Sequence, residues 1–272
     1  MFNINLPART LSIPSLVLLL ASTTAAETVQ FPTASSSQPV TVTAELYRPS
    51  GNGPFNAVVL LHTCGGVGKK ESQYGTALRS EGYVVLVPDS FASRGNRRKG
   101  NRCTPGNYDN HVSDSVSDAI GAAVYLRSLS YVRGDRIAIM GMSLGGTATL
   151  SLPAEAMDQG IRAAVAYYPP CVQPDGKHFF KESKIPLLLL LGELDNWSPT
   201  AACVAKAEEI KKSGRIVEWT IYPGTHHGFD NQDYYSAVSD NRGRTMQYSQ
   251  SASDDSWNRF KTFLTKNLGK EP

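Results

Sequence analysis

Seven short apolar runs between residues 40 and 222 constrain the fold of this chain more than any other feature. The first, at residues 40–47, alternates β-branched and other side chains, as an edge strand of a sheet does. The other six are continuous, which is typical of strands buried on both faces. They lie at residues 56–62, 83–88, 136–140, 161–168, 185–191 and 216–222.

Helical patterns lie between these runs, so strand and helix alternate along the chain. They cover residues 71–80, 112–129, 199–212 and 256–268. Alternation of this kind predicts an α/β fold with a mostly parallel central sheet and helices on both faces. No repeat or linker divides the sequence, and 272 residues can bury one sizeable core. We therefore expect a single domain over residues 27–272.

The first 26 residues have the order of a secretory signal peptide. Arg9 is their only charged residue, residues 11–21 are mostly apolar, and small residues at 24–26 offer a cleavage site before Glu27. The alternative is an uncleaved membrane anchor, but the apolar run of about eleven residues is shorter than the roughly 20 that span a bilayer. We expect cleavage of residues 1–26, a secreted or periplasmic protein, and no stable membrane insertion.

Overall composition favours an ordinary globular protein. Hydrophobic residues make up 41% of the chain and charged residues 19%, unlike the composition of disordered chains. The formal net charge of +3 is too small to indicate a nucleic-acid partner.

The chain has four cysteines, an even number, and is expected to reach an oxidising compartment. None of them forms a C-x-x-C pair, so the sequence indicates no metal site. Cys64 and Cys103 lie on the loops that follow two neighbouring predicted strands, Cys171 follows a third strand, and Cys203 lies at the start of the helix after the next strand. This placement favours the disulfides Cys64–Cys103 and Cys171–Cys203. The alternative is that some of the four remain free and buried.

One serine, Ser143, lies between glycines directly after a predicted strand. The stretch from Gly141 to Gly145 fits G-x-S-x-G, the nucleophile-elbow pattern. Because glycine and serine are common, about one chain in ten of this length contains the pattern by chance. The pattern alone does not separate a catalytic serine from an ordinary loop serine.

Two later strands are followed by further reactive residues. Asp195 follows one of them, and His226 and His227 follow the next, which gives the order serine, aspartate, histidine. Such residues converge because reactive groups gather outside the carboxyl ends of parallel strands. A histidine can take the serine proton and a carboxylate can orient the histidine. Glu193 is the rival for the carboxylate, and His226 is the rival for the base.

The sequence resembles the dienelactone hydrolase family of α/β hydrolases over about residues 40–268. The resemblance rests on the motifs LLHTCGG, VPDSFASRG, GMSLGG, LGELDNWSP and YPGTHHGF, which begin at residues 60, 87, 141, 191 and 222. It implies a triad of Ser143, Asp195 and His227. It also implies an oxyanion hole formed by the backbone amides of Leu144 and Cys64, and no cofactor.

Two positions depart from the name-giving members of this family. Those members have a cysteine where this chain has Ser143, and a glutamate where it has Thr63. Dienelactone is therefore not the expected substrate. The resemblance implies a serine esterase variant that acts on ordinary carboxylic esters.

Four residues are candidates for the substrate pocket: His62, Thr63, Met142 and His226. His62 has an alternative structural role, because it is also placed to brace the following Gly65–Gly66 turn. The pocket residues are scattered over several loops, so they do not define the acyl or alcohol group of the substrate.

Other charged positions have structural alternatives as well. Asp89 is expected to hold its own loop by bonding to backbone or to Arg94, and Asp118 is expected to be a structural partner. Five positive charges at residues 94–102 form either a solvated loop or a device that favours anionic substrates. Residues 230–253 are polar and rich in tyrosine, and they form either a lid or a surface excursion.

These features predict an exported serine hydrolase that cleaves carboxylic esters, with a small-molecule ester as its partner. A small serine peptidase or amidase of the same fold is the alternative enzyme, since a triad does not distinguish esters from amides. A non-catalytic binding protein that keeps the fold is the alternative from another class. A missing triad residue would be typical of such a protein, and none is missing. The oligomeric state is left open.

Overall fold

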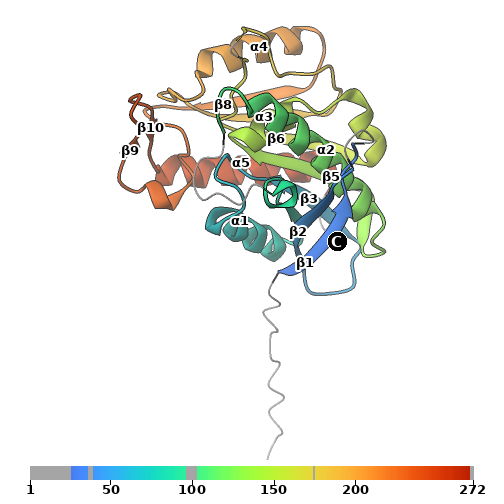
Figure 1. Ribbon diagram of the computed structural model, residues 1–272. Helices are drawn as coiled ribbons and strands as arrows, with labels where there is room; N and C mark the ends of the chain where they lie inside the picture. Colours follow the sequence, from blue (N-terminus) through green and yellow to red (C-terminus); the bar gives the residue numbers. More distant parts are fainter. Residues whose placement is uncertain (1–25, 36–38, 96–102, 174, 270–272) are drawn as a thin grey trace, which may run out of the picture.

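The computed structural model describes residues 26–35, 39–95, 103–173 and 175–269. These residues include an eight-stranded sheet in the order β1-β2-β4-β3-β5-β6-β7-β8 (Figure 1). Neighbouring strands are parallel from β4 to β8, while β2 is antiparallel to both β1 and β4. The strands are β1 (Glu27–Pro32), β2 (Thr41–Tyr47), β3 (Phe55–Leu61), β4 (Val84–Pro88), β5 (Val132–Met142), β6 (Ile161–Tyr167), β7 (Leu187–Gly192) and β8 (Val217–Tyr222).

Helices pack on both faces of this sheet, which confirms the predicted fold class. α1 (Lys69–Ser80) and α5 (Gln250–Leu268) cover one face. The other face is covered by α2 (Tyr108–Arg127), α3 (Leu144–Leu150) and α4 (Thr200–Lys212). All seven residues of β3 are buried because successive side chains point into the two cores in turn. Burial on both sides explains why the inner strands are continuous apolar runs.

The expectation that residues 40–47 form an edge strand is wrong. β2 lies inside the sheet, between β1 and β4. The edge is β1, whose six residues pair with β2 from Glu27↔Leu46 to Pro32↔Thr41. The alternating pattern of β2 arises because its residues Val42, Ala44 and Leu46 are buried while the intervening side chains are partly exposed.

The predicted helices are found with shifted boundaries, and α2, expected over residues 112–129, spans Tyr108–Arg127. α5 begins at Gln250, six residues before the expected residue 256, and the Ser249 hydroxyl caps it by accepting from the Ala252 amide at 3.4 Å. Before this helix, residues 230–249 contain a short 3₁₀ turn, η3 (Gln232–Tyr234), and a small hairpin of β9 (Val238–Ser239) and β10 (Thr245–Met246). The remaining 3₁₀ turns are η1 (Ala92–Arg94) and η2 (Ala154–Gln159).

The carboxyl ends of the parallel strands all lie at one edge of the sheet. The segments that follow β3, β5, β7 and β8 carry His62, Ser143, Asp195 and His227. Within the residues described above, none of the helices is long and apolar enough to cross a membrane.

Candidate active site

Ser143 lies at a sharp turn between β5 and α3. Its φ is 53° and its ψ is −111°, a backbone conformation that residues other than glycine rarely adopt. The turn is held on one side by the Ser143 amide, which donates to the Tyr167 carbonyl at 3.0 Å. On the other side, the Thr147 amide donates to the Ser143 carbonyl at 2.9 Å. The Ser143 side chain is partly exposed at the end of the sheet.

Two glycines make this turn possible. A Cβ atom on Gly141 would lie 2.0 Å from the Gly145 carbonyl oxygen, and one on Gly145 would lie 2.3 Å from the Leu61 carbonyl oxygen. Neither distance is tolerated between real atoms, so the backbone of α3 meets β5 and β3 only where side chains are absent. Close backbone contacts therefore explain why glycine is required at both glycine positions of the G-x-S-x-G pattern.

A hydrogen-bond chain joins Ser143, His227 and Asp195. His227 Nε2 is 3.0 Å from Ser143 Oγ, and His227 Nδ1 is 2.8 Å from Asp195 Oδ2. The side chains of Asp195 and His227 are only 1% and 6% exposed. Asp195 Oδ1 accepts from the Trp197 amide at 2.9 Å and from the Ser198 amide at 2.8 Å, so the carboxylate is fixed. This arrangement can remove the hydroxyl proton of a serine.

Two aromatic side chains hold the His227 imidazole, and sequence reasoning assigned neither of them. Trp197 stacks on it with ring centroids 5.7 Å apart and an interplanar angle of 23°. Tyr168 approaches it at 4.6 Å with an angle of 64°. Trp197 follows Asp195 by two residues and Tyr168 follows β6 directly, so position after a strand was the signal that could have found both.

The amides of Leu144 and Cys64 have no hydrogen-bond acceptor within the described part of the chain. Leu144 is the first residue of α3, and Cys64 lies on the loop after β3. The Gly145 amide donates to the His62 carbonyl at 3.1 Å, which ties the start of α3 to that loop. Both expected oxyanion donors thus lie on segments that are joined beside Ser143.

The candidate pocket residues near this loop have structural partners. His62 is buried, and its Nδ1 donates to the Thr63 carbonyl at 2.7 Å, while its ring packs against Phe91 at 4.7 Å. Thr63 Oγ1 accepts from the Gly65 amide at 3.1 Å. Both residues therefore shape the turn.

The other two candidates differ from each other in burial. Met142 is fully buried in the core on the α1 and α5 face. His226 is half-buried, with Nδ1 3.2 Å from the Leu194 carbonyl oxygen. Of these two, only His226 has a side chain that is open to solvent.

Glu193 bonds to a backbone amide and not to the imidazole of His227. It is exposed, and its Oε2 accepts from the Gly224 amide at 2.8 Å. The carboxylate that bonds to His227 is that of Asp195. His226, the rival histidine, is likewise not the residue bonded to Ser143.

Asp89 and Asp118 are structural, as the sequence suggested. Asp89 Oδ1 accepts from the amides of Phe91 and Ala92 at 3.1 and 2.9 Å. Asp118 is fully buried and binds the Arg94 guanidinium with both oxygens, at 2.8 and 2.9 Å. The guanidinium of Arg94 is thus bound to a buried carboxylate. Residues 96–102, which carry the other charges of the basic stretch, lie outside the described residues.

The structure contains two disulfides, Cys64–Cys103 and Cys171–Cys203. This is the pairing that the strand-end argument predicts. The first joins the loop after β3 to the loop before α2, and the second joins the loop after β6 to α4. Both therefore link segments at the edge of the sheet where Ser143 and His227 lie.

Residues 230–249 pack on the loop that carries Asp195. Asn196 bonds to the Gly243 carbonyl at 3.0 Å and to the Thr245 amide at 2.9 Å. The guanidinium of Arg244 lies 3.7 Å from the centroid of the Trp197 ring. Part of the segment whose role was left open thus supports the tryptophan that stacks on His227.

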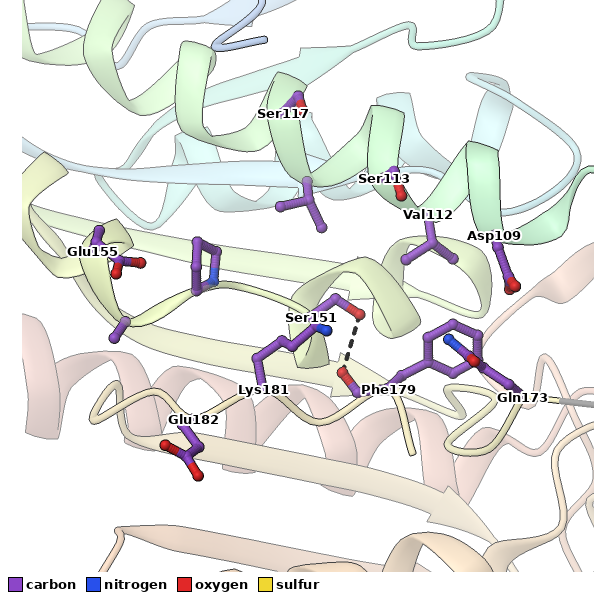
Figure 2. Close-up of a pocket in the computed structure, with 13 residues that line it drawn as sticks. Asp109, Val112, Ser113, Ser117, Ser151, Glu155, Gln173, Phe179, Lys181 and Glu182 are labelled. Carbon is purple, nitrogen blue, oxygen red and sulfur yellow. Dashed lines mark hydrogen bonds between the residues drawn. The ribbon is translucent and has the colours of Figure 1, made fainter. Parts of the chain in front are cut away.

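A surface hollow of about 640 Å³ lies elsewhere, between α2 and the segments after α3 and β6 (Figure 2). Ser113 and Val112 of α2 lie on one side of it, and Lys181 and Glu182 on the other. None of its lining residues belongs to the Ser143, His227 and Asp195 chain. Across the described ranges, no group of three or more His, Cys, Asp or Glu side chains is arranged to hold a metal ion.

Comparisons with known proteins agree with this fold. A Methylorubrum extorquens protein whose name describes it as a carboxymethylenebutenolidase is 24% identical over 232 residues, covering 79% of this chain and 74% of that protein. A Klebsiella pneumoniae structure solved under the name dienelactone hydrolase has a TM-score of 0.68 at 20% identity, covering 89% of this chain and 100% of that one. The apo form of Thermogutta terrifontis esterase 2 has a TM-score of 0.65 at 20% identity, covering 91% of this chain and 97% of the esterase.

At these identities the two structures show the shared fold alone. The sequence pattern of the dienelactone hydrolase family, however, matches residues 42–268, which is most of the chain. The protein therefore belongs to the dienelactone hydrolase family.

Proposed function

We propose that this protein is an exported serine hydrolase that cleaves small carboxylic esters through an acyl-enzyme on Ser143. As a member of the dienelactone hydrolase family, it is a hydrolase of ester bonds. The observation that carries the finer proposal is the continuous chain from Ser143 Oγ through His227 to Asp195, at 3.0 and 2.8 Å.

In the first step, Ser143 Oγ attacks the ester carbonyl carbon while its proton passes to His227 Nε2. Asp195 accepts the hydrogen bond from Nδ1–H of His227, which leaves Nε2 free to act as the base. The carboxylate also stabilises the imidazolium that forms. Because the Trp197 and Ser198 amides hold Asp195, its oxygen keeps this orientation during the reaction.

The negative charge that develops on the carbonyl oxygen needs hydrogen-bond donors. The amides of Leu144 and Cys64 are proposed for this role, since neither has an acceptor among the described residues. Leu144 directly follows Ser143, and Cys64 lies on the loop that is bonded to the start of α3. Donors of this kind each contribute about 10²–10³ in rate. The Gly145–His62 bond, which joins their two segments, supports this assignment.

Collapse of the tetrahedral intermediate releases the alcohol, which takes its proton from His227. A water molecule then gives a proton to Nε2 and attacks the acyl carbon. Collapse of this second intermediate releases the acid, and Ser143 Oγ takes the proton back from His227 as it leaves. Every bond in this cycle is made or broken by Ser143, His227 and water, so the proposal requires no cofactor.

The proposed substrates are ordinary carboxylic esters rather than dienelactone. Serine replaces the cysteine nucleophile of the name-giving enzymes, and Thr63 replaces their glutamate. The Thr63 hydroxyl is occupied by the Gly65 amide, so it serves the turn rather than presenting a charge to a substrate.

Export through residues 1–26 is part of the proposal. Support comes from the two disulfides, because such bonds persist in oxidising compartments. Residues 1–25 lie outside the described part of the chain. Amino-terminal sequencing of protein recovered from the periplasm or medium should begin at Glu27, whereas a start at Met1 would contradict cleavage.

A fluorophosphonate probe tests the nucleophile directly. It should label the wild-type protein at Ser143, located by peptide mapping, and should leave Ser143→Ala unlabelled. Labelling at another serine, or unchanged ester hydrolysis by Ser143→Ala, would contradict the mechanism. A hydrolysis screen over esters of graded chain length, with a lactone and a peptide amide included, then defines the substrate class.

A further inference from the structure

A buried ion pair lies behind the proposed base, in a place that the reaction itself does not use. Lys70 of α1 is 2.7 Å from Asp230, and their side chains are 9% and 0% exposed. Asp230 Oδ1 also accepts from the Tyr168 hydroxyl at 2.7 Å, and its Oδ2 accepts from the Tyr74 hydroxyl at 2.7 Å. Lys70 completes the cluster through a direct contact with the Tyr168 hydroxyl. We refer to these four residues as the Asp230 cluster.

The Asp230 cluster is connected to His227 in two ways. Asp230 follows His227 by three residues, so the cluster ties the histidine loop to α1. Tyr168 belongs to the cluster through its hydroxyl, while its ring contacts the imidazole at 4.6 Å. One residue thus links the buried charges to the side chain proposed as the base.

Tyr168 is held in a conformation that it would not adopt without support. Its φ is 37°, and among the described non-glycine residues only Tyr168 and Ser143 have a positive φ. The two are adjacent in space, because the Ser143 amide bonds to the carbonyl of Tyr167. Backbone strain persists only where surrounding contacts hold it, and it concentrates at functional sites. For Tyr168, the backbone amide donates to the Leu190 carbonyl at 2.8 Å, and the hydroxyl bonds of the Asp230 cluster hold the side chain.

Stability alone does not explain such a cluster. A buried ion pair is often no more stabilising than apolar side chains of similar size, because the charges lose their hydration. Burial, together with the negative charge of Asp230, raises the pKa of the Tyr168 phenol well above its usual value. Tyr168 therefore remains a hydrogen-bond donor to Asp230 through the neutral and mildly alkaline range.

We propose that Tyr168, anchored by Asp230 and Lys70, is a positioning residue that keeps the His227 imidazole aligned between Ser143 and Asp195. The inference rests on the proposed function, since it concerns the geometry of the same triad. Trp197 stacks on the imidazole as a second support, but its own anchor is Arg244 rather than a buried network. Loss of the Tyr168 hydroxyl should free the ring to shift and leave His227 misaligned in part of the population.

Tyr168→Phe and Tyr74→Phe form a matched pair for the test. Each removes one phenol hydroxyl from the same buried carboxylate, on opposite oxygens, and each keeps its ring. Tyr168 touches His227, whereas the ring contacts of Tyr74 are with Tyr167 and Trp257. A merely structural role predicts the same outcome for both variants, and a positioning role separates them.

The measurements are kcat and KM for one ester and the rate of fluorophosphonate labelling of Ser143. They are made at a temperature where circular dichroism shows both variants folded. Tyr168→Phe should lower kcat and the labelling rate by about 10-fold with KM within about 2-fold, since small misalignments at a reacting group are costly. Tyr74→Phe should stay within about 2-fold of wild type in all three quantities.

Equal kcat values for the two variants, with an active wild type, would overturn the positioning role and leave the proposed function intact. A change in KM alone for Tyr168→Phe would also overturn it. A wild-type protein that hydrolyses no ester and takes no fluorophosphonate label would overturn the proposed function, and this inference with it.

Discussion

The Gly145 amide donates a hydrogen bond to the His62 carbonyl oxygen at 3.1 Å, and this hydrogen bond joins the turn at Ser143 to the loop that carries Cys64. The two segments are far apart in sequence but must keep a fixed separation, because each is proposed to supply one oxyanion donor. Their relative position is set by backbone contact, which requires glycine at residue 145.

Gly145→Ala should nearly abolish activity. The added methyl group would lie 2.3 Å from the Leu61 carbonyl oxygen, so α3 must move away from the loop after β3. We expect kcat for ester hydrolysis to fall by at least about 100-fold, because the serine and the oxyanion donors lose their alignment. Gly106→Ala is the control, since nothing lies within 4 Å of its Cβ position, and it should retain wild-type kcat. An active Gly145→Ala variant would show that the turn tolerates a side chain.

Asp195→Asn and Glu193→Gln discriminate between the two carboxylates of one loop. Asp195→Asn should lower kcat by roughly 10⁴, because an amide no longer fixes the histidine tautomer. Glu193→Gln keeps an oxygen that can accept from the Gly224 amide, and its kcat should stay within about 2-fold of wild type. Steady-state hydrolysis of a chromogenic ester provides the measurement. A large loss in Glu193→Gln would reassign the carboxylate.

The two disulfides should differ in their effect on activity. The double variants Cys64→Ala/Cys103→Ala and Cys171→Ala/Cys203→Ala each open a loop, of 39 and 32 residues respectively. Each should lower the free energy of unfolding by about 2–4 kcal/mol, measured by urea titration. Only the first releases the loop whose Cys64 amide is a proposed oxyanion donor, so only the first should lower kcat several-fold. Equal kcat values for the two double variants would show that the Cys64–Cys103 disulfide has no particular role in catalysis.

Stability should decline at alkaline pH through the buried tyrosines. Burial, reinforced by the hydrogen bond to Glu45, raises the pKa of the Tyr47 phenol to about 12 from the ordinary value of 10.0. The folded state therefore keeps a proton that the unfolded chain releases, so this contribution is complete below pH 10.0 and is lost as the pH rises toward about 12. Urea unfolding at several pH values should show the decline, and Tyr47→Phe should make it shallower. An unchanged slope in Tyr47→Phe would place the linkage at other tyrosines.

The layered fold and the convergence of Ser143, Asp195 and His227 were predictable because both follow from local pattern. A strand that is buried on both faces requires a continuous apolar run such as residues 56–62, so these runs predict the inner strands directly. The positions of Ser143, Asp195 and His227 after such strands then place them at one edge of the sheet. In contrast, β1 was not predicted, because its alternation is limited to two buried residues, Val29 and Phe31, which is too short to indicate a strand without its partner β2.

The supports of the histidine were not predictable for a different reason. Tyr168, Lys70 and Asp230 are brought together from three separate elements, and no spacing in the sequence relates them. Lys70 is one of two adjacent lysines, and it is buried while Lys69 is exposed. Helical periodicity does not predict which of the two lysines is buried, because that depends on the position of Asp230 in the folded protein.

The backbone conformation of Ser143 lowers the conformational stability of the folded protein. Its φ of 53° is a conformation that glycine adopts with less strain than serine. Ser143→Gly should therefore be inactive yet more stable than the wild type, by roughly 1 kcal/mol, the lower end of what such strain costs. The turn that lifts the hydroxyl out of the sheet thus marks a trade-off between conformational stability and turnover, located at one residue.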